Sequence, residues 1–103
     1  MEKTTPRGEV LSEASELIHG DRNQSYGSPM QNFTNIADLV DVRLRHKLLP
    51  GEKITPEDVA DIMILLKVAR NIAQNKRDNY VDIAGYAACA WEVTQEGKNG
   101  NRF

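Results

Sequence analysis

The sequence predicts an all-α protein, and three observations support this fold class. Apolar residues recur at the three- and four-residue spacing of one helix face in four separate segments of the 103-residue chain. Two of these segments open with a hydroxyl residue followed by proline, Ser28-Pro29 and Thr55-Pro56, which is a typical helix start. No segment shows a strand pattern that competes with the helices. We therefore expect a compact domain resembling a four-helix bundle.

The first two helices have clear start and stop signals. The first is expected from about Gly8 to His19, with Gly20 as a left-handed cap after its last turn. Its apolar face consists of Val10, Leu11, Ala14, Leu17 and Ile18. The second helix is expected to begin at Ser28-Pro29 and to stop before Pro50-Gly51. Its apolar face consists of Met30, Phe33, Ala37, Val40 and Leu44.

The third helix, from Thr55 to about Gln74, is apolar around most of its circumference. Its polar sector is only about 100° wide and contains Lys67, Arg70, Asn71 and Gln74. A helix with such a narrow polar face must be covered on most sides, and three short partner helices cover it poorly in a monomer. We therefore expect that the domain is completed by oligomerisation around this helix.

The fourth helix is expected from about Asp78 to Glu96, and Gly97 ends it. The length of the chain fits a single helical domain over residues 1–103. Its core is expected at about residues 8–96, followed by a flexible tail over residues 97–103.

Four residues of the second and fourth helices carry specific expectations. Phe33 and Trp91 are expected in the core. Cys89, the only cysteine, cannot form an internal disulfide, which fits a reducing compartment, and is expected to be a small buried residue. Gly85 lies inside the fourth helix, where glycine costs about 1 kcal/mol relative to alanine. We therefore expect a helix or a ligand to approach the backbone closely at Gly85.

Charge and hydropathy exclude two classes of partner. With 13 basic and 15 acidic side chains the formal net charge is -2, so we expect no DNA partner. The chain has no run of about eighteen apolar residues, and residues 1–6 lack the pattern of a secretory signal, so we expect no membrane partner. These features predict a cytoplasmic protein.

The connection between the first two helices, residues 20–27, is a candidate binding segment. It combines two glycines with many polar groups and brings Arg22 and Tyr26 close to the start of the second helix. An arginine, an aromatic ring and free backbone N–H groups suit a phosphorylated planar ligand such as a nucleotide. The alternative is a turn in which Arg22 pairs with an acid from another helix.

Asp61 and Asp82 fall within apolar sectors of the third and fourth helices. A buried carboxylate is costly unless a cation or several donors meet it, so each aspartate is expected to have a partner, and Arg22 is a candidate. A structural ion pair is one outcome, and metal or ligand binding is the other. Lys67 and Arg70 are three residues apart and face the same way, so they could hold phosphate oxygens or form a solvated stripe.

A set of short motifs spans about residues 10–96. The motifs are Gly20-Asp21-Arg22, Tyr26-Gly27, Asn32-Phe33, Thr55 through Val59, Lys67 through Arg70, and Asp78 through Asp82 with Gly85 and Tyr86. In these motifs the chain resembles a family of small helical proteins of bacteriophages and prophages that is classed as a domain of unknown function. The resemblance implies a phage origin, an all-α fold and a place in the host cell cytoplasm, and it implies no particular activity.

Glu13-x-x-Glu16 and Asp58-x-x-Asp61 are two pairs of acids at one-turn spacing. They carry a weaker similarity to the MazG-type all-α nucleoside triphosphate pyrophosphohydrolases, which hold Mg²⁺ with two such pairs. The two pairs lie farther apart along this chain than in that family.

Three functions follow from these observations. The first is a phage-encoded nucleotide-binding protein that sequesters a nucleotide immune signal and needs no cofactor, as an anti-defence sponge. Its ligand contacts would be Arg22, Tyr26, Lys67, Arg70, Asp82 and Tyr86. The second is a MazG-like enzyme in which Asp58 and Asp61 hold Mg²⁺. The third is a structural or protein-interaction module. The sequence leaves open whether the protein is an enzyme, and we expect a homo-oligomer.

Overall fold

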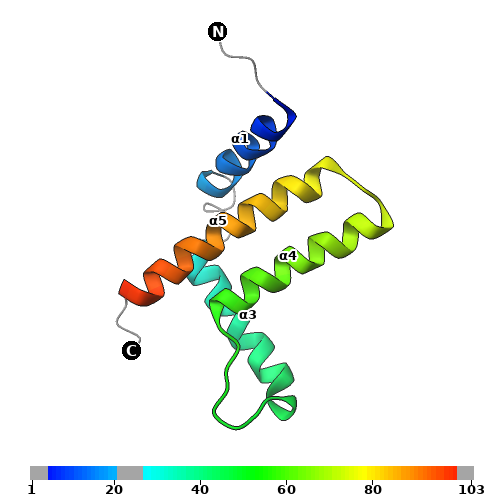
Figure 1. Cartoon of the computed structure of the whole chain (residues 1–103). Coiled ribbons are helices and arrows are strands. Elements are labelled where there is room, and N and C mark those ends of the chain that lie inside the picture. The colour runs from blue at the N-terminus through cyan, green and yellow to red at the C-terminus, as the bar shows by residue number, and fades with distance from the viewer. Residues whose placement is uncertain (1–4, 21–26, 100–103) are drawn as a thin grey trace.

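The computed structural model describes residues 5–20 and 27–99, and this part of the chain is helical and contains no strand. Its elements are α1 (Pro6–His19), α3 (Pro29–Leu44), the 3-10 turn η1 (Arg45–Lys47), α4 (Pro56–Ala73) and α5 (Arg77–Asn99). Figure 1 shows α4 and α5 side by side, with α1 beside the first half of α5. The helix α3 packs against both α4 and α5. The predicted all-α, bundle-like fold is confirmed.

Three helices begin with the same local chemistry, a hydroxyl cap followed by proline. The hydroxyl oxygens of Thr5, Ser28 and Thr55 each accept a hydrogen bond from a backbone N–H three residues later, at 3.0 to 3.2 Å. These caps satisfy backbone donors that have no partner inside the helix, and proline is preorganised for the first position. The predicted starts at Ser28 and Thr55 are confirmed, and the first helix begins at Pro6, two residues before Gly8.

The ends of the helices differ more from prediction than the starts. Gly20 has a φ of -115°, so it is not the left-handed cap that the sequence predicts. The second helix gives way to a 3-10 turn at Arg45, and Gly51 takes the left-handed conformation in the following loop, with φ 86°. The helix α5 continues through Asn99, so residues 97–99 are helical although the sequence predicts them in a flexible tail.

A small core forms where α3, α4 and α5 meet. It consists of Phe33, Ala37, Val59, Ala60, Tyr86, Cys89 and Val93. The predicted burial of Phe33 and Cys89 is confirmed. The prediction for Trp91 is wrong, because its side chain is 65% exposed. Trp91 follows Cys89 by two residues, which is about 200° around a helix, so it points away from the core side of α5.

The exposed side of α4 is apolar, and part of its polar sector faces inward. Lys67 and Asn71 contact residues of α5, whereas five large apolar residues are exposed: Ile62, Leu65, Leu66, Val68 and Ile72. The idea that this polar sector forms a solvated stripe is therefore wrong for Lys67 and Asn71. The radius of gyration is 15.5 Å, compared with about 13 Å for a compact domain of this length. Because its five apolar residues are exposed, one side of α4 is left uncovered by the described part of a single chain.

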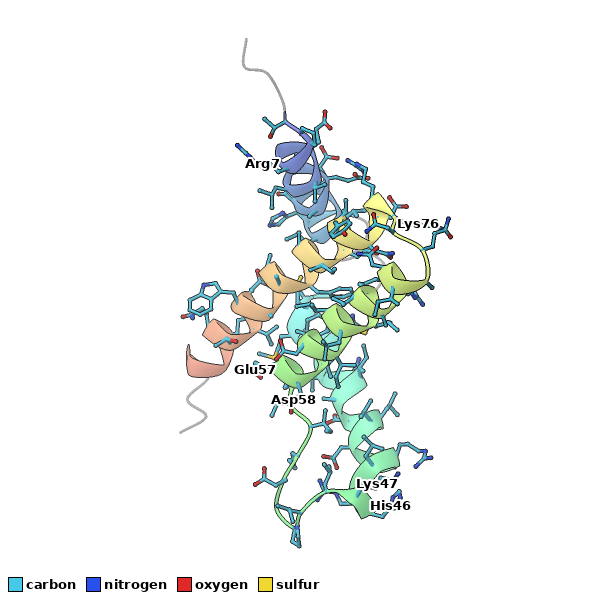
Figure 2. The ribbon with its side chains drawn as sticks, turned by 45° about the vertical axis from the view of Figure 1, so that its right-hand side comes forward. Arg7, His46, Lys47, Glu57, Asp58 and Lys76 are labelled. Atoms are coloured by element: carbon cyan, nitrogen blue, oxygen red, sulfur yellow. The ribbon has the colours of Figure 1, made fainter. Side chains whose placement is uncertain are left out.

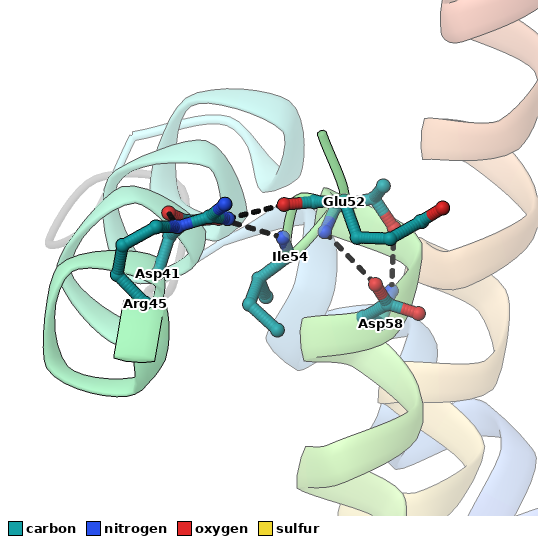
Figure 3. Close-up of polar contacts among 6 residues, drawn as sticks. Asp41, Arg45, Glu52, Ile54 and Asp58 are labelled. Carbon is teal, nitrogen blue, oxygen red and sulfur yellow. Dashed lines mark hydrogen bonds and ion pairs between the residues drawn. The ribbon is translucent and has the colours of Figure 1, made fainter. Parts of the chain in front are cut away.

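A polar cluster fixes the loop between α3 and α4 to the end of α3 (Figure 3). Asp41 accepts hydrogen bonds from the backbone N–H of Ile54 at 3.0 Å and from the Arg45 guanidinium at 3.0 and 3.2 Å. Arg45 also donates to the carbonyl oxygen of Glu52. The Ile54 N–H and the Arg45 guanidinium lower the pKa of Asp41, because both stabilise its ionised form.

Candidate functional site

A pocket lies where the end of α1, the start of α3 and the first half of α5 meet. From α1 it is lined by Ala14, Leu17 and Ile18, from α3 and the residues just before it by Gly27, Pro29, Asn32 and Phe33, and from α5 by Val81, Asp82, Gly85, Tyr86 and Cys89. Most of these side chains are apolar, and the polar groups come from a few positions. The pocket thus combines Asp82 and Tyr86, two of the six residues that the sequence predicts as ligand contacts.

Gly85 explains how α1 can lie so close to α5. A Cβ atom added at Gly85 would lie only 3.2 Å from Cγ2 of Ile18, which is a tight contact. The absence of a side chain at Gly85 therefore lets Ile18 reach the backbone of α5. The predicted close approach at Gly85 is confirmed, and the element that approaches is a helix.

Two aromatic rings form part of the pocket wall. The centroids of the Phe33 and Tyr86 rings are 6.2 Å apart, with 37° between the ring planes. This separation falls within the range of favourable aromatic pairs. Because Phe33 and Tyr86 are both buried, the two rings have a fixed position relative to α3 and α5.

Asp82 receives its cation from the neighbouring helix α4. Nζ of Lys67 lies 2.8 Å from Oδ2 of Asp82, and the two side chains are only 12% and 18% exposed. The prediction that Asp82 needs a cationic partner is therefore confirmed, but the partner in the described part of the chain is Lys67. The predicted alternative, Arg22, lies outside the described residues, as does Tyr26.

Lys67 and Arg70, the predicted cationic pair, lie in different surroundings. Lys67 points toward α5 and its ammonium is engaged by Asp82. Arg70 is exposed on α4 and does not line the pocket. The three-residue spacing puts Lys67 and Arg70 about 60° apart around the helix, and the boundary between the covered and the exposed side of α4 falls between them.

The two pairs of acids that resemble the MazG metal site are Glu13 with Glu16 on α1, and Asp58 with Asp61 on α4. In the described part of one chain, α1 and α4 do not contact each other. On α1, Glu13 forms an ion pair with Arg77. On α4, Asp58 closes a capping box, because its carboxylate accepts from the backbone N–H of Thr55 at 3.0 Å (Figure 3). Within residues 5–20 and 27–99 no three His, Cys, Asp or Glu side chains converge as metal ligands.

Asp61 departs from its prediction. The helical wheel places Asp61 in an apolar sector, so the sequence predicts a buried carboxylate that needs a partner. In the structure Asp61 is exposed, and so are its apolar neighbours Leu65 and Val68. The expectation of burial is wrong because the apolar side of α4 is the side that the single chain leaves uncovered.

Sequence reasoning missed a buried asparagine that supports this region. Asn79 is 7% exposed, and its side-chain amide donates to Oδ1 of Asn71 at 2.8 Å. The same oxygen accepts from the backbone N–H of Lys76 at 3.2 Å. The spacing of Asn79, Asp82 and Tyr86 on one helix face was the available signal. This contact fixes the turn between α4 and α5.

A second hollow adjoins the pocket along the same helices. It shares Ile18, Pro29 and Cys89 with the pocket, and His19, Ala88, Trp91 and Glu92 complete its lining. Trp91, which is not part of the core, therefore lines this hollow. The hollow continues the pocket along α5.

Residues 9–94 match the family described as Domain of unknown function (DUF6378), and the chain belongs to this family. The Gene 55 protein of mycobacteriophage D29 is 41% identical over 92 residues, covering 88% of this chain and 57% of the relative. The Gene 55 protein of mycobacteriophage L5 is 46% identical over 79 residues, covering 76% of this chain and 47% of the relative. The chain thus spans about half the length of these curated relatives.

These matches confirm the predicted phage family of unknown function, whereas they lend nothing to the MazG resemblance. No solved structure has significant similarity to the chain. In the part of the chain that the structure describes, none of the helices has both the length and the apolar character needed to cross a membrane.

Proposed function

We propose that this protein is a phage-encoded nucleotide-binding protein that holds its ligand without converting it. One observation carries the proposal: among the described residues, the pocket between α1, α3 and α5 combines apolar walls and the Tyr86 ring with one carboxylate, Asp82. Small-molecule sites are typically apolar concavities with a few well-placed polar groups. A nucleobase has flat apolar faces and a polar edge, so the chemistry of this lining suits it.

Each polar group of the pocket has a role in this proposal. The carboxylate of Asp82, which pairs with Lys67, can also accept hydrogen bonds from amino or ring N–H groups of a ligand. Asn32 offers both a donor and an acceptor to the base edge. The aromatic side of the wall supplies a surface for the base, whose contact with aromatic rings is worth about 1–3 kcal/mol.

The sugar and phosphates would extend beyond the base pocket. The adjoining hollow gives them room along α5. Lys67 is neutralised by Asp82, so a phosphate would need another cation, and Arg22 is our proposed contact. Arg22 and Tyr26 lie outside the described residues, in the connection that leads directly to Gly27 of the pocket wall. Arg70 has no contact in this proposed site.

Binding without turnover would suit a phage protein that removes a nucleotide signal used by host defence. The family membership supports the phage part of this proposal, and the pocket supports the nucleotide part. A sponge of this kind needs a stable pocket and no cofactor. It acts by lowering the free concentration of the signal.

The test is to incubate the protein with pooled nucleoside triphosphates and cyclic nucleotides, with Mg²⁺ present, and to remove the unbound fraction. Denaturing the protein should then release an intact nucleotide, which is identified by mass spectrometry. Asp82→Asn should weaken retention by about ten- to a hundredfold, because a hydrogen bond to a charged group is lost. Asp61→Asn, an exposed aspartate outside the pocket, is the matched control and should retain the nucleotide.

Two other outcomes would contradict the proposal. Monophosphate and pyrophosphate in the unbound fraction would establish the alternative of a MazG-like pyrophosphohydrolase, in which Asp58 and Asp61 hold Mg²⁺. Absence of any retained or converted nucleotide would favour the alternative of a structural or protein-interaction module. In that case Asp82→Asn should change stability alone.

A further inference from the structure

One side of α4 carries an uncovered apolar row with the spacing of a helix-pairing seam. Ile62, Leu65, Ala69 and Ile72 follow each other at intervals of three, four and three residues, and all four side chains are exposed. We call these four residues the α4 strip. Alternation of three and four places residues along one line of a helix and is the spacing by which two helices interlock. None of the four lines the pocket, so this inference is independent of the proposed function.

The two ends of α4 carry opposite charges. Glu57, Asp58 and Asp61 lie in its first two turns, and Arg70 and Lys76 lie in its last turn and in the turn that follows. Figure 2 shows Glu57 and Asp58 at one end of the helix and Lys76 at the other. In the described part of the chain Asp61, Arg70 and Lys76 form no ion pair. The apolar strip is therefore bounded by an acidic end and a basic end.

This distribution makes the surface complementary to a second copy of itself. If two copies of α4 pair in opposite directions, the acidic end of each lies beside the basic end of the other. The helix dipoles are then also opposed, which is the favourable arrangement. A parallel pair would instead bring acid to acid and base to base. A two-fold axis produces such a contact from the same patch on both chains.

We propose that two copies of this protein associate through their α4 strips in antiparallel orientation, with the two-fold axis between Leu65 and Ala69. In this arrangement Ile62 of each copy lies near the partner's Ile72, and Leu65 lies near the partner's Ala69. The contact would cover apolar residues of α4 that are exposed in the single chain. The helix α4 then becomes the centre of the assembly.

The first experiment measures the mass of the full chain by sedimentation equilibrium over a range of concentrations. The wild type should reach twice the 11.6 kDa of one chain. Leu65→Glu should weaken the dimer by at least about tenfold, because it places a carboxylate at the centre of the seam. Leu11→Glu is the matched control, because Leu11 on α1 and Leu65 are both 64% exposed in the single chain. It should dimerise like the wild type.

The proposal is overturned if the wild type stays monomeric at every concentration, or if Leu65→Glu keeps the wild-type mass. It is also overturned if Leu11→Glu dissociates the dimer as strongly as Leu65→Glu. Circular dichroism should give equal helix content for both variants and the wild type. If Leu65→Glu fails to fold, the decision passes to the disulfide experiment, which introduces no charge into the seam.

The second experiment tests orientation by disulfide formation in a Cys89→Ala background. A mixture of Ile62→Cys and Ile72→Cys chains should form the mixed disulfide upon mild oxidation, because those positions face each other in the antiparallel pair. Each variant alone should cross-link poorly. Efficient self-linking of Ile62→Cys would indicate a parallel pair, and absence of all cross-linking would indicate no α4 contact. Either result would overturn the proposal.

Discussion

Lys67 of α4 and Asp82 of α5 are joined by an ion pair of 2.8 Å between two largely buried side chains. The pair links the two longest helices and lies beside the pocket to which Asp82 belongs. Removing either partner would leave the other charge, which is mostly buried, without this ion pair. The pair therefore connects the stability of the fold with the polarity of the candidate site.

Lys67→Met should lower the free energy of unfolding by about 1–3 kcal/mol, because it leaves a mostly buried carboxylate without its cation. Asp82→Asn in the Lys67→Met background should recover part of this loss, since the mostly buried charge that lost the Lys67 cation is then removed. Urea unfolding of the two single variants and the double variant measures the coupling. Additive losses would show that the pair contributes no coupling energy.

Gly85→Leu should destabilise the protein by about 1–3 kcal/mol, because the new side chain overlaps Ile18 and pushes α1 away from α5. Ala87→Leu on the exposed side of α5 is the control and should stay within about 0.5 kcal/mol of the wild type. Thermal unfolding followed by circular dichroism compares the two. Equal stability of both variants would contradict the close approach of α1.

Asp58→Ala should lower the free energy of unfolding by about 0.5–2 kcal/mol, because it removes one half of the capping box of α4. Retention of a nucleotide should be unchanged, since Asp58 does not line the pocket. Thr55→Ala removes the other half, and the double variant should lose less than the sum of the two losses. Loss of nucleotide retention by folded Asp58→Ala would contradict this assignment.

Asp41→Asn should destabilise the protein at neutral pH and much less in acid. The Ile54 N–H and the Arg45 guanidinium lower the pKa of Asp41 in the folded state. A carboxyl group with a lowered folded pKa contributes stability above its unfolded pKa, and this contribution is lost as the pH falls through the folded pKa. Urea unfolding from neutral to acidic pH should make the two curves converge. Asp38→Asn, an exposed change on the same helix, should show a smaller difference from the wild type at neutral pH.

Local chemistry made the helix starts predictable, whereas tertiary packing decided the rest. A hydroxyl residue followed by proline carries its structural meaning within a few residues, as Ser28 and Thr55 show. The burial of Cys89 and the close approach at Gly85 follow from residue size. Trp91 shows the limit, because its apolar character does not reveal that it lies on the side of α5 that faces away from the core.

The candidate site was predictable in part for the same reason. Helical spacing identified Asp82 and Tyr86 as sharing one face of a helix, and both reach the pocket. Spacing does not reveal which helix lies opposite that face, so it did not identify Lys67 as a cation for Asp82. Arg22, the candidate partner named from the sequence, lies outside the described residues. For Asp61 the composition of α4 indicated a covered helix, but only the arrangement of the other helices decides which side they leave open.

The attachment of α1 has a consequence for how the pocket exchanges its contents. Among the described elements α1 packs only on α5, so its detachment breaks a single helix interface and leaves the contacts among α3, α4 and α5 intact. Elements with few partners open with the smallest free energy, and amide hydrogen exchange detects this opening. Since α1 also forms one wall of the pocket, opening of this helix provides an entrance. A molecule held there would slow amide exchange in α1 more than in the other helices.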